Sequence, residues 1–180
     1  ASKGSTNREQ REIGAKAILE DIATLPEGSN VLVVGDMNFY TNKEPAYQTF
    51  VEILIDPLGT DEWAGADDAQ KHTQSPRTIR DAGLIHGGLD DRFDFQFISK
   101  SLQDGKDLDI IRSSYHALGN DGEHYDIAIN EGDNEYYSHD KTRSNELATA
   151  LHEASDHIPV IADYDVIKQE KANTSTDTTE

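Results

Sequence analysis

The sequence predicts an α/β fold, and two patterns of apolar residues carry that prediction. Three segments repeat apolar residues at helical spacing: 15–25, 44–56 and 147–154. Four shorter segments have the apolar runs or alternation typical of strands: 31–34, 92–97, 109–115 and 158–164, of which 109–115 is the weaker candidate. The 180 residues suit one domain around one core, because two comfortable domains need a longer chain.

The first predicted helix presents one apolar face and has a clear end. Its face consists of Ala15, Ile18, Ile22 and Leu25. Pro26 and Gly28 then stop the pattern, because neither favours a helix interior. The strand that follows, 31–34, is β-branched and apolar, which indicates a buried strand. It ends in Gly35-Asp36-Met37-Asn38, where polar residues replace apolar ones.

The second predicted helix begins at Glu44-Pro45, since proline suits the first helical position. One face carries Tyr47, Phe50, Val51 and Leu54, and Asp56-Pro57 ends the helix. Residues 58–88 are rich in Gly, Asp, Thr and Ser and show little periodicity. We expect them to form a long surface excursion, and loops of that length often carry function.

The strand at 92–97 alternates strictly. Three phenylalanines lie on one face, while Arg92, Asp94 and Gln96 lie on the other. After a polar loop at 119–139, the third helix presents Leu147, Ala150, Leu151 and Ala154, and Ser155-Asp156-His157 leads into the last strand. Residues 168–180 have almost nothing apolar to bury and are predicted to be a disordered tail.

The amino-acid composition limits the catalytic groups and metal ligands that this protein can use. There are no cysteines, which excludes thiolate nucleophiles and cysteine zinc sites and leaves Asp, Glu and His as metal ligands. The net charge of −19 excludes a broad basic surface for nucleic acid, so bound divalent metal would have to offset repulsion of an anionic substrate locally. No stretch approaches the roughly 20 apolar residues of a membrane-spanning helix, and no membrane span is expected.

Polar residues accompany three of the predicted strands, and the five are Asp36, Asn38, Asp94, Asp156 and His157. Taken singly, each has a simple structural interpretation. Asp36 and Asn38 suit a turn, Asp94 a half-exposed strand position, and Asp156 with His157 a helix C-terminus. Because α/β sheets collect ligand sites at strand ends, the five could also converge on one cleft.

The three motifs in this order resemble the endonuclease/exonuclease/phosphatase superfamily. They are a strand ending Gly35-Asp36-Met37-Asn38, Arg92-Phe93-Asp94-Phe95, and Ser155-Asp156-His157 before an apolar strand. The resemblance runs from about Arg8 to Tyr164. Three further stretches have sequences similar to those of secreted bacterial, Bacteroidetes-type members. They are Glu44-Pro45-Ala46-Tyr47, His72-Thr73-Gln74-Ser75 and Gly119-Asn120-Asp121-Gly122. The resemblance thus implies an extracellular or periplasmic location.

The resemblance implies a fold and a role for each residue. The fold would be the C-terminal portion of a four-layer α/β/β/α sandwich, with a mixed, mostly antiparallel sheet and flanking helices. Asp36 would activate the attacking water, Asn38 would donate to a phosphate oxygen, and His157 would stabilise developing negative charge. Asp94 would orient His157, and Asp156 would ligate Mg²⁺ or Mn²⁺, with zinc on an imidazole as the weaker alternative.

The resemblance also implies a missing part. A complete domain of this superfamily is longer, and its N-terminal half supplies a metal-ligand Glu that has no counterpart here. Residues 1–167 are therefore expected to be a partial domain whose missing half is its partner. Glu9 and Glu12, on the first predicted helix, are not replacements for that glutamate. We expect the chain alone to be inactive or weakly active, and less stable than its parent.

Further residues are candidates for contact with substrate. His72, Arg77 and Arg92, together with Arg80, His86 and His116, could line the substrate cleft. Arginine suits bidentate phosphate recognition, although a loop arginine is more often solvated. The acidic segment 120–133 could hold a structural Ca²⁺, but it lacks EF-hand spacing. His152 and His157 do not form a zinc-protease motif, because they are five residues apart where one helical face needs four.

The sequence thus predicts a divalent-metal-dependent phosphoester hydrolase. A phosphodiesterase or nuclease acting on nucleic acid is the leading hypothesis. The alternatives are a phosphomonoesterase or phospholipid phosphodiesterase with the same site, of the inositol phosphatase or sphingomyelinase type, and a non-catalytic remnant or interaction module. The absent glutamate supports the remnant, whereas five competent side chains oppose it.

Overall fold

The computed structural model describes residues 4–167 and has a mixed α/β architecture, as the sequence predicts. Its elements in chain order are α1 (Ser5–Ile22), β1 (Leu32–Asp36), α2 (Pro45–Val51), the 3₁₀ helix η1 (Ala66–Lys71), β2 (Asp94–Ile98), the 3₁₀ helix η2 (Lys100–Gln103), β3 (Leu108–Ala117), α3 (Lys141–Ala154) and β4 (Val160–Val166). The predicted tail at 168–180 lies outside the described residues. None of the helices in 4–167 has the length and apolar character that crossing a membrane requires.

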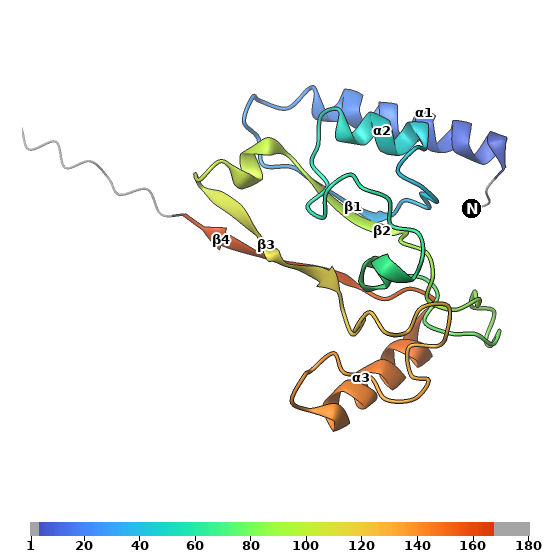
Figure 1. Cartoon of the computed structure of the whole chain (residues 1–180). Coiled ribbons are helices and arrows are strands. Elements are labelled where there is room, and N and C mark those ends of the chain that lie inside the picture. The colour runs from blue at the N-terminus through green and yellow to red at the C-terminus, as the bar shows by residue number, and fades with distance from the viewer. Residues whose placement is uncertain (1–3, 168–180) are drawn as a thin grey trace, which may run out of the picture.

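The first sheet consists of β1 and β2, which pair antiparallel from Leu32 opposite Ile98 to Asp36 opposite Asp94. Successive residues of a strand point to opposite faces. The face that carries Phe95 and Phe97 packs under α1 and α2, which lie across this sheet in Figure 1. Asp36 and Asp94 therefore lie together on the other face, at one end of the sheet.

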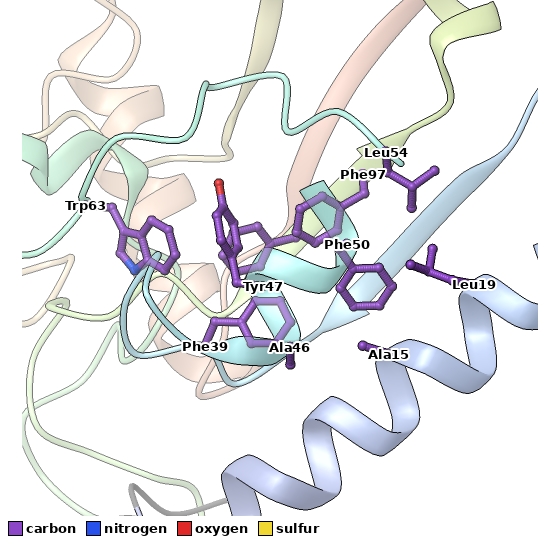
Figure 2. Close-up of a cluster of buried hydrophobic side chains, with 10 residues drawn as sticks. Ala15, Leu19, Phe39, Ala46, Tyr47, Phe50, Leu54, Trp63 and Phe97 are labelled. Atoms are coloured by element: carbon purple, nitrogen blue, oxygen red, sulfur yellow. The ribbon is translucent and has the colours of Figure 1, made fainter. Parts of the chain in front are cut away.

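An aromatic core fills the space between this sheet and the two helices. Figure 2 shows Phe39, Tyr47, Phe50 and Phe97 gathered between Trp63 at one end and the α1 side chains at the other. The rings of Phe95 and Phe97 stack with centroids 5.2 Å apart. Buried aromatic rings contribute large apolar areas to stability, so this core fixes the strands that end at Asp36 and begin at Asp94.

The second sheet pairs β3 and β4 antiparallel, with a register shift between Ile111 and His116. It packs against the other side of β2, where Ile98 contacts the cluster that includes Ile110 and Tyr115. The side chain of Gln96 also donates to the carbonyl of Val160 at 2.9 Å. At one end of this sheet, α3 packs on the residues that lead out of β3 and into β4 (Figure 1).

The predicted elements are present, although two predictions about burial are wrong. The strand expected to be buried, β1, is mostly exposed, with Leu32 and Val34 at 42% and 60%, and the buried face of the first helix differs from the expected one. Ala15 and Leu19 are its buried residues, at 2% and 8% exposure, whereas Ile18 and Leu25 are 39% and 46% exposed. Both faces have helical spacing. The difference arises because α1 packs on α2 through the Ala15–Leu19 side, and Leu25 lies beyond the helix end at Ile22.

Arg92 corrects the prediction of a polar strand face from 92 to 97. The strand begins at Asp94, and Arg92 is buried, with two hydrogen bonds of 2.8 Å from its guanidinium to the two carboxylate oxygens of Asp56. The guanidinium carbon lies 4.1 Å from the ring centroid of Phe95. Tyr47 also donates to Asp56 at 3.1 Å. Arg92 is thus engaged with Asp56 in the core, not exposed for substrate.

Replacing Arg92 by Met is expected to lower the free energy of unfolding by about 3–5 kcal/mol, because Asp56 would keep a buried charge without its partner. The double variant Asp56→Leu/Arg92→Met should recover most of that loss. Urea unfolding followed by circular dichroism measures both. Arg112→Met, at an exposed arginine, is the control and should change stability by less than about 0.5 kcal/mol. Equal effects of Arg92→Met and Arg112→Met would contradict the assignment.

Candidate functional site

The predicted site residues come together where the two sheets meet. Asp36 ends β1, Asp94 begins β2 opposite it, and His157 lies three residues before β4 begins. A cavity of about 390 Å³ opens at this point. Its lining includes Asp36, Asn38, Asp156 and His157, so four of the five predicted residues share one cavity and the fifth, Asp94, contacts His157.

The imidazole of His157 lies between two carboxylates. Its Nδ1 is 2.7 Å from Oδ2 of Asp94, and its Nε2 is 3.9 Å from Oδ2 of Asp36. Since a carboxylate only accepts, Nδ1 carries the proton of the shorter contact, and Nε2 faces the cavity. Burial disfavours the imidazolium, but the hydrogen bond and charge of Asp94, with two further carboxylates, outweigh it and raise the pKa of His157.

Asp36 and Asn38 form a tight turn at the end of β1. The backbone N–H and the side-chain amide of Asn38 both donate to Oδ1 of Asp36, at 3.0 and 2.6 Å. Asn38 has a positive φ of 52°, which asparagine tolerates better than most residues. In this arrangement Oδ1 of Asp36 has two donors, whereas Oδ2 is the oxygen on the side of His157.

Asp156 is oriented by the loop across the cavity. The backbone N–H of Ile85 donates to its Oδ2 at 2.9 Å. The next residue, His157, donates its backbone N–H to Oγ of Ser155 at 3.1 Å. The bond from Ile85 holds the Asp156 carboxylate at the cavity wall without using all of its acceptor capacity.

The cavity is strongly acidic. The carboxylate residues in its lining are Asp36, Asp90, Asp91 and Asp156. Among the lining residues of the described chain there is no Lys or Arg, and Tyr40 and Phe93 form an aromatic rim with ring centroids 4.8 Å apart. Such a cavity attracts cations and repels a bare phosphate. Over residues 4–167, no three His, Asp or Glu side chains gather as a ready metal-ligand group.

His72 and Arg77 correct the expectation of cleft residues, because both are buried and bonded within the protein. The ring nitrogens of His72 lie 2.7 and 3.3 Å from the carbonyl oxygens of Trp63 and Leu89. Arg77 donates to the carbonyl of His152. With Arg92, they stabilise the fold. Segment 58–88 is therefore partly interior, because it supplies these buried polar residues and Trp63 to the core.

The other three residues expected to line the cleft, Arg80, His86 and His116, differ in where they lie. His86 lines the cavity as expected, whereas Arg80 is exposed and is not among its lining residues. The ring of His116 contacts the carbonyl of Ser114 and the hydroxyl of Tyr136, away from the cavity.

Thr73 is a residue that sequence reasoning missed. Its buried hydroxyl accepts from the backbone N–H groups of Phe93 and Asp94, both at 3.1 Å, and its carbonyl accepts from Ile158 N at 2.9 Å. It therefore fixes the backbone beside Asp94 and beside His157 at once. No local pattern signals this, because Thr73 lies in an aperiodic segment and its partners are about 20 and 85 residues away.

The acidic segment 120–133 is organised by hydrogen bonds around Asp121. Oδ1 of Asp121 accepts from Glu123 N and from His124 Nδ1, at 3.0 and 2.8 Å, and Oδ2 accepts from Glu135 N at 2.8 Å. Burial opposes the ionised carboxylate, but these bonds outweigh it and lower the pKa of Asp121. The hydrogen bond to Asp121 raises the pKa of His124. Calcium in this segment stays a prediction, because these three bonds already engage both carboxylate oxygens of Asp121 within the protein.

Comparison with models of protein families, with curated proteins and with solved structures found no match for this chain. The chemistry of the cavity, together with the order of motifs in the sequence, is thus the basis for proposing a function.

Thr73→Val is expected to lower the free energy of unfolding by about 1–3 kcal/mol, because two buried backbone N–H groups lose their acceptor while the volume hardly changes. Thr73→Ser keeps the oxygen and is the matched control. Thermal and urea unfolding of the three proteins compare them. If Val and Ser variants are equally stable, the hydroxyl does not have the role assigned to it.

The Asp121–His124 pair predicts a pH-dependent stability. The folded pKa of His124 is above 6.5, so its contribution is full below that pH and is lost as pH rises through the folded value. The folded pKa of Asp121 is below 3.8, so its contribution is lost only as pH falls through that lower value. Urea unfolding from about pH 5 to 9 should show the wild type losing its advantage over His124→Gln toward high pH. A constant difference would contradict this.

Proposed function

We propose that this protein is a divalent-metal-dependent phosphoester hydrolase of the endonuclease/exonuclease/phosphatase type, acting on phosphodiesters in nucleic acid. One observation carries the proposal. His157 lies within 4 Å of both Asp36 and Asp94, so residues from three distant segments meet at a cavity that Asn38 and Asp156 also line. If each of these three residues had only a separate structural role, nothing would require them to lie together.

The fold supports the same proposal. Two helices cover one sheet and the second sheet packs on its other side, while α3 packs at one end of the second sheet (Figure 1). We interpret this order as the second half of a four-layer α/β/β/α sandwich. The strand-end motifs then occupy the edge where such a sandwich would hold its site.

Asp36 is the proton acceptor in the proposed reaction. Asn38 occupies Oδ1 with two hydrogen bonds, which leaves Oδ2 as the basic oxygen toward the cavity. A water held at Oδ2 loses its proton to Asp36 as its oxygen attacks phosphorus. The bond from phosphorus to the leaving ester oxygen breaks on the opposite side, in line with the attack, and the leaving oxygen takes the bonding electron pair and a proton from solvent water.

His157 stabilises the negative charge that develops on the phosphoryl oxygens. Asp94 holds Nδ1, so the ring plane is fixed and Nε2 faces the cavity. A donor fixed before reaction costs no reorganisation when negative charge grows on a phosphoryl oxygen. In this geometry Asp94 is the residue that positions His157.

The donor set fits Mg²⁺ or Mn²⁺. Such ions favour oxygen ligands, keep several waters and often use one or two protein carboxylates. Asp156 is the proposed ligand, because Ile85 N–H orients its carboxylate at the wall, and Asp36, Asp90 and Asp91 surround the same cavity. Bound metal would offset the carboxylate charge and polarise the phosphoryl oxygen.

Supercoiled plasmid tests the proposal. Mg²⁺ or Mn²⁺ is supplied in excess, because one identified ligand favours weak metal binding. Protein is in molar excess over plasmid, because this chain is expected to be at most weakly active. We expect slow nicking that EDTA abolishes. His157→Ala and Asp36→Asn should slow it by about 100-fold or more. His139→Ala, at an exposed histidine outside the cavity, should keep the wild-type rate.

A panel that adds sphingomyelin vesicles and inositol phosphates assigns the substrate class. If the protein turns over one of these in place of plasmid, it is a phosphoester hydrolase whose substrate is a phospholipid or an inositol phosphate, not nucleic acid. Metal-dependent turnover that proceeds at an equal rate with His157→Ala would refute the proposed function.

A further inference from the structure

The nitrogen of His157 that faces the cavity already has a partner. Nε2 of His157 lies 2.6 Å from the side-chain amide of Gln74, and both residues line the cavity. Gln74 comes from segment 58–88, more than 80 residues before His157 in the sequence. Neither the motif of His157 nor that of Asp94 includes it.

Backbone hydrogen bonds fix the position of Gln74. Its N–H donates to the carbonyl of Asp91 at 3.0 Å, and its carbonyl accepts from the N–H groups of Asp90 and Asp91, at 3.0 and 2.9 Å. Asp91 lies three residues before β2, so the backbone of Gln74 is fixed against the strand that carries Asp94. The amide therefore reaches His157 from a backbone that cannot shift freely, and only its side-chain torsions remain adjustable.

An amide suits this position chemically. Asp94 fixes the proton on Nδ1, so Nε2 presents either a lone pair or an N–H. Glutamine satisfies both, because its NH₂ group donates and its carbonyl oxygen accepts after rotation. It also adds a donor to the acidic cavity without adding charge.

Two other side-chain donors of the cavity already have a protein acceptor. The amide of Asn38, expected from sequence to take this role, donates to Asp36 at 2.6 Å. The hydroxyl of Ser75 donates to the carbonyl of Ile85 at 2.9 Å. Gln74 and His157 are adjacent on one wall. Nε2 of His157 accepts from the Gln74 amide in this structure, and the two nitrogens are close enough to contact one phosphate oxygen once Nε2 carries a proton.

We propose that Gln74 is a phosphate-contacting residue, whose amide leaves Nε2 of His157 when substrate binds and donates to the phosphoryl oxygen that Nε2 also contacts. This inference rests on the proposed function. In the unliganded protein the same amide keeps the imidazole satisfied and holds it at the cavity wall. Gln74 thereby takes the role that the sequence assigned to Asn38, while Asn38 orients Asp36.

Phosphate titration followed by NMR tests the proposal without requiring turnover. Inorganic phosphate is added to ¹⁵N-labelled full-length chain with Mg²⁺, and the side-chain NH₂ signal of Gln74 and the ring signals of His157 are followed. Both should move along one saturable curve. Gln74→Leu should weaken phosphate binding by about two- to tenfold, which is the range of one neutral hydrogen bond. Gln74→Glu should weaken it further, because a carboxylate repels the anion.

Gln70→Leu is the matched control, since Gln70 is exposed, lies outside the cavity, and should leave phosphate binding unchanged. If His157 responds to phosphate while Gln74 does not, or if Gln74→Leu binds phosphate as the wild type does, the inference is refuted and the proposed function stands. If neither residue responds and plasmid is not nicked, the proposed function fails, and the role of Gln74 fails with it.

Discussion

The hydrogen bond from Nδ1 of His157 to Asp94 joins two parts of the protein that the backbone pairs separately. Asp94 belongs to the sheet under α1 and α2, whereas His157 leads into the sheet beside α3. The antiparallel register also places Asp36 opposite Asp94, which sets two like charges side by side. An imidazole between them relieves that repulsion. The arrangement of the cavity, and of everything that lines it, depends on this contact.

Sequence patterns identified the parts of the site that local structure determines. Asp36, Asn38, Asp156 and His157 lie at strand ends, where a change from apolar to polar residues marks them in the sequence. Asp94 follows from strict alternation with three phenylalanines. The order of helices and strands was predictable for the same reason, because periodicity reports burial on one face. The buried side of α1 was not, since two adjacent faces have equally good spacing.

Long-range partners account for the errors and omissions. The sequence predicts a phosphate-binding role for Arg92. In the structure its partner is Asp56, a carboxylate that lies 36 residues earlier in the chain and is buried in the core. His72 and Arg77 bind carbonyl oxygens that carry no sequence signal at all. Thr73 and Gln74 stand in a stretch that the resemblance includes, but the sequence assigns them no role, because they act through the backbone beside β2 and through His157. In an aperiodic segment such as 58–88, composition suggests a loop, while the contacts that give it a role come from elsewhere.

The buried pair of Arg92 and Asp56 also determines how the protein should respond to ionic strength. With a net charge of −19, the exposed surface repels itself, and salt at about 0.1 M screens such charges beyond roughly 10 Å. The side chains of Arg92 and Asp56 are 2% and 1% exposed, so dissolved ions hardly reach them. Salt therefore relieves the surface repulsion while the attraction in the interior persists. For this acidic protein, a saline medium is a stabilising environment and dilute buffer is the more demanding one.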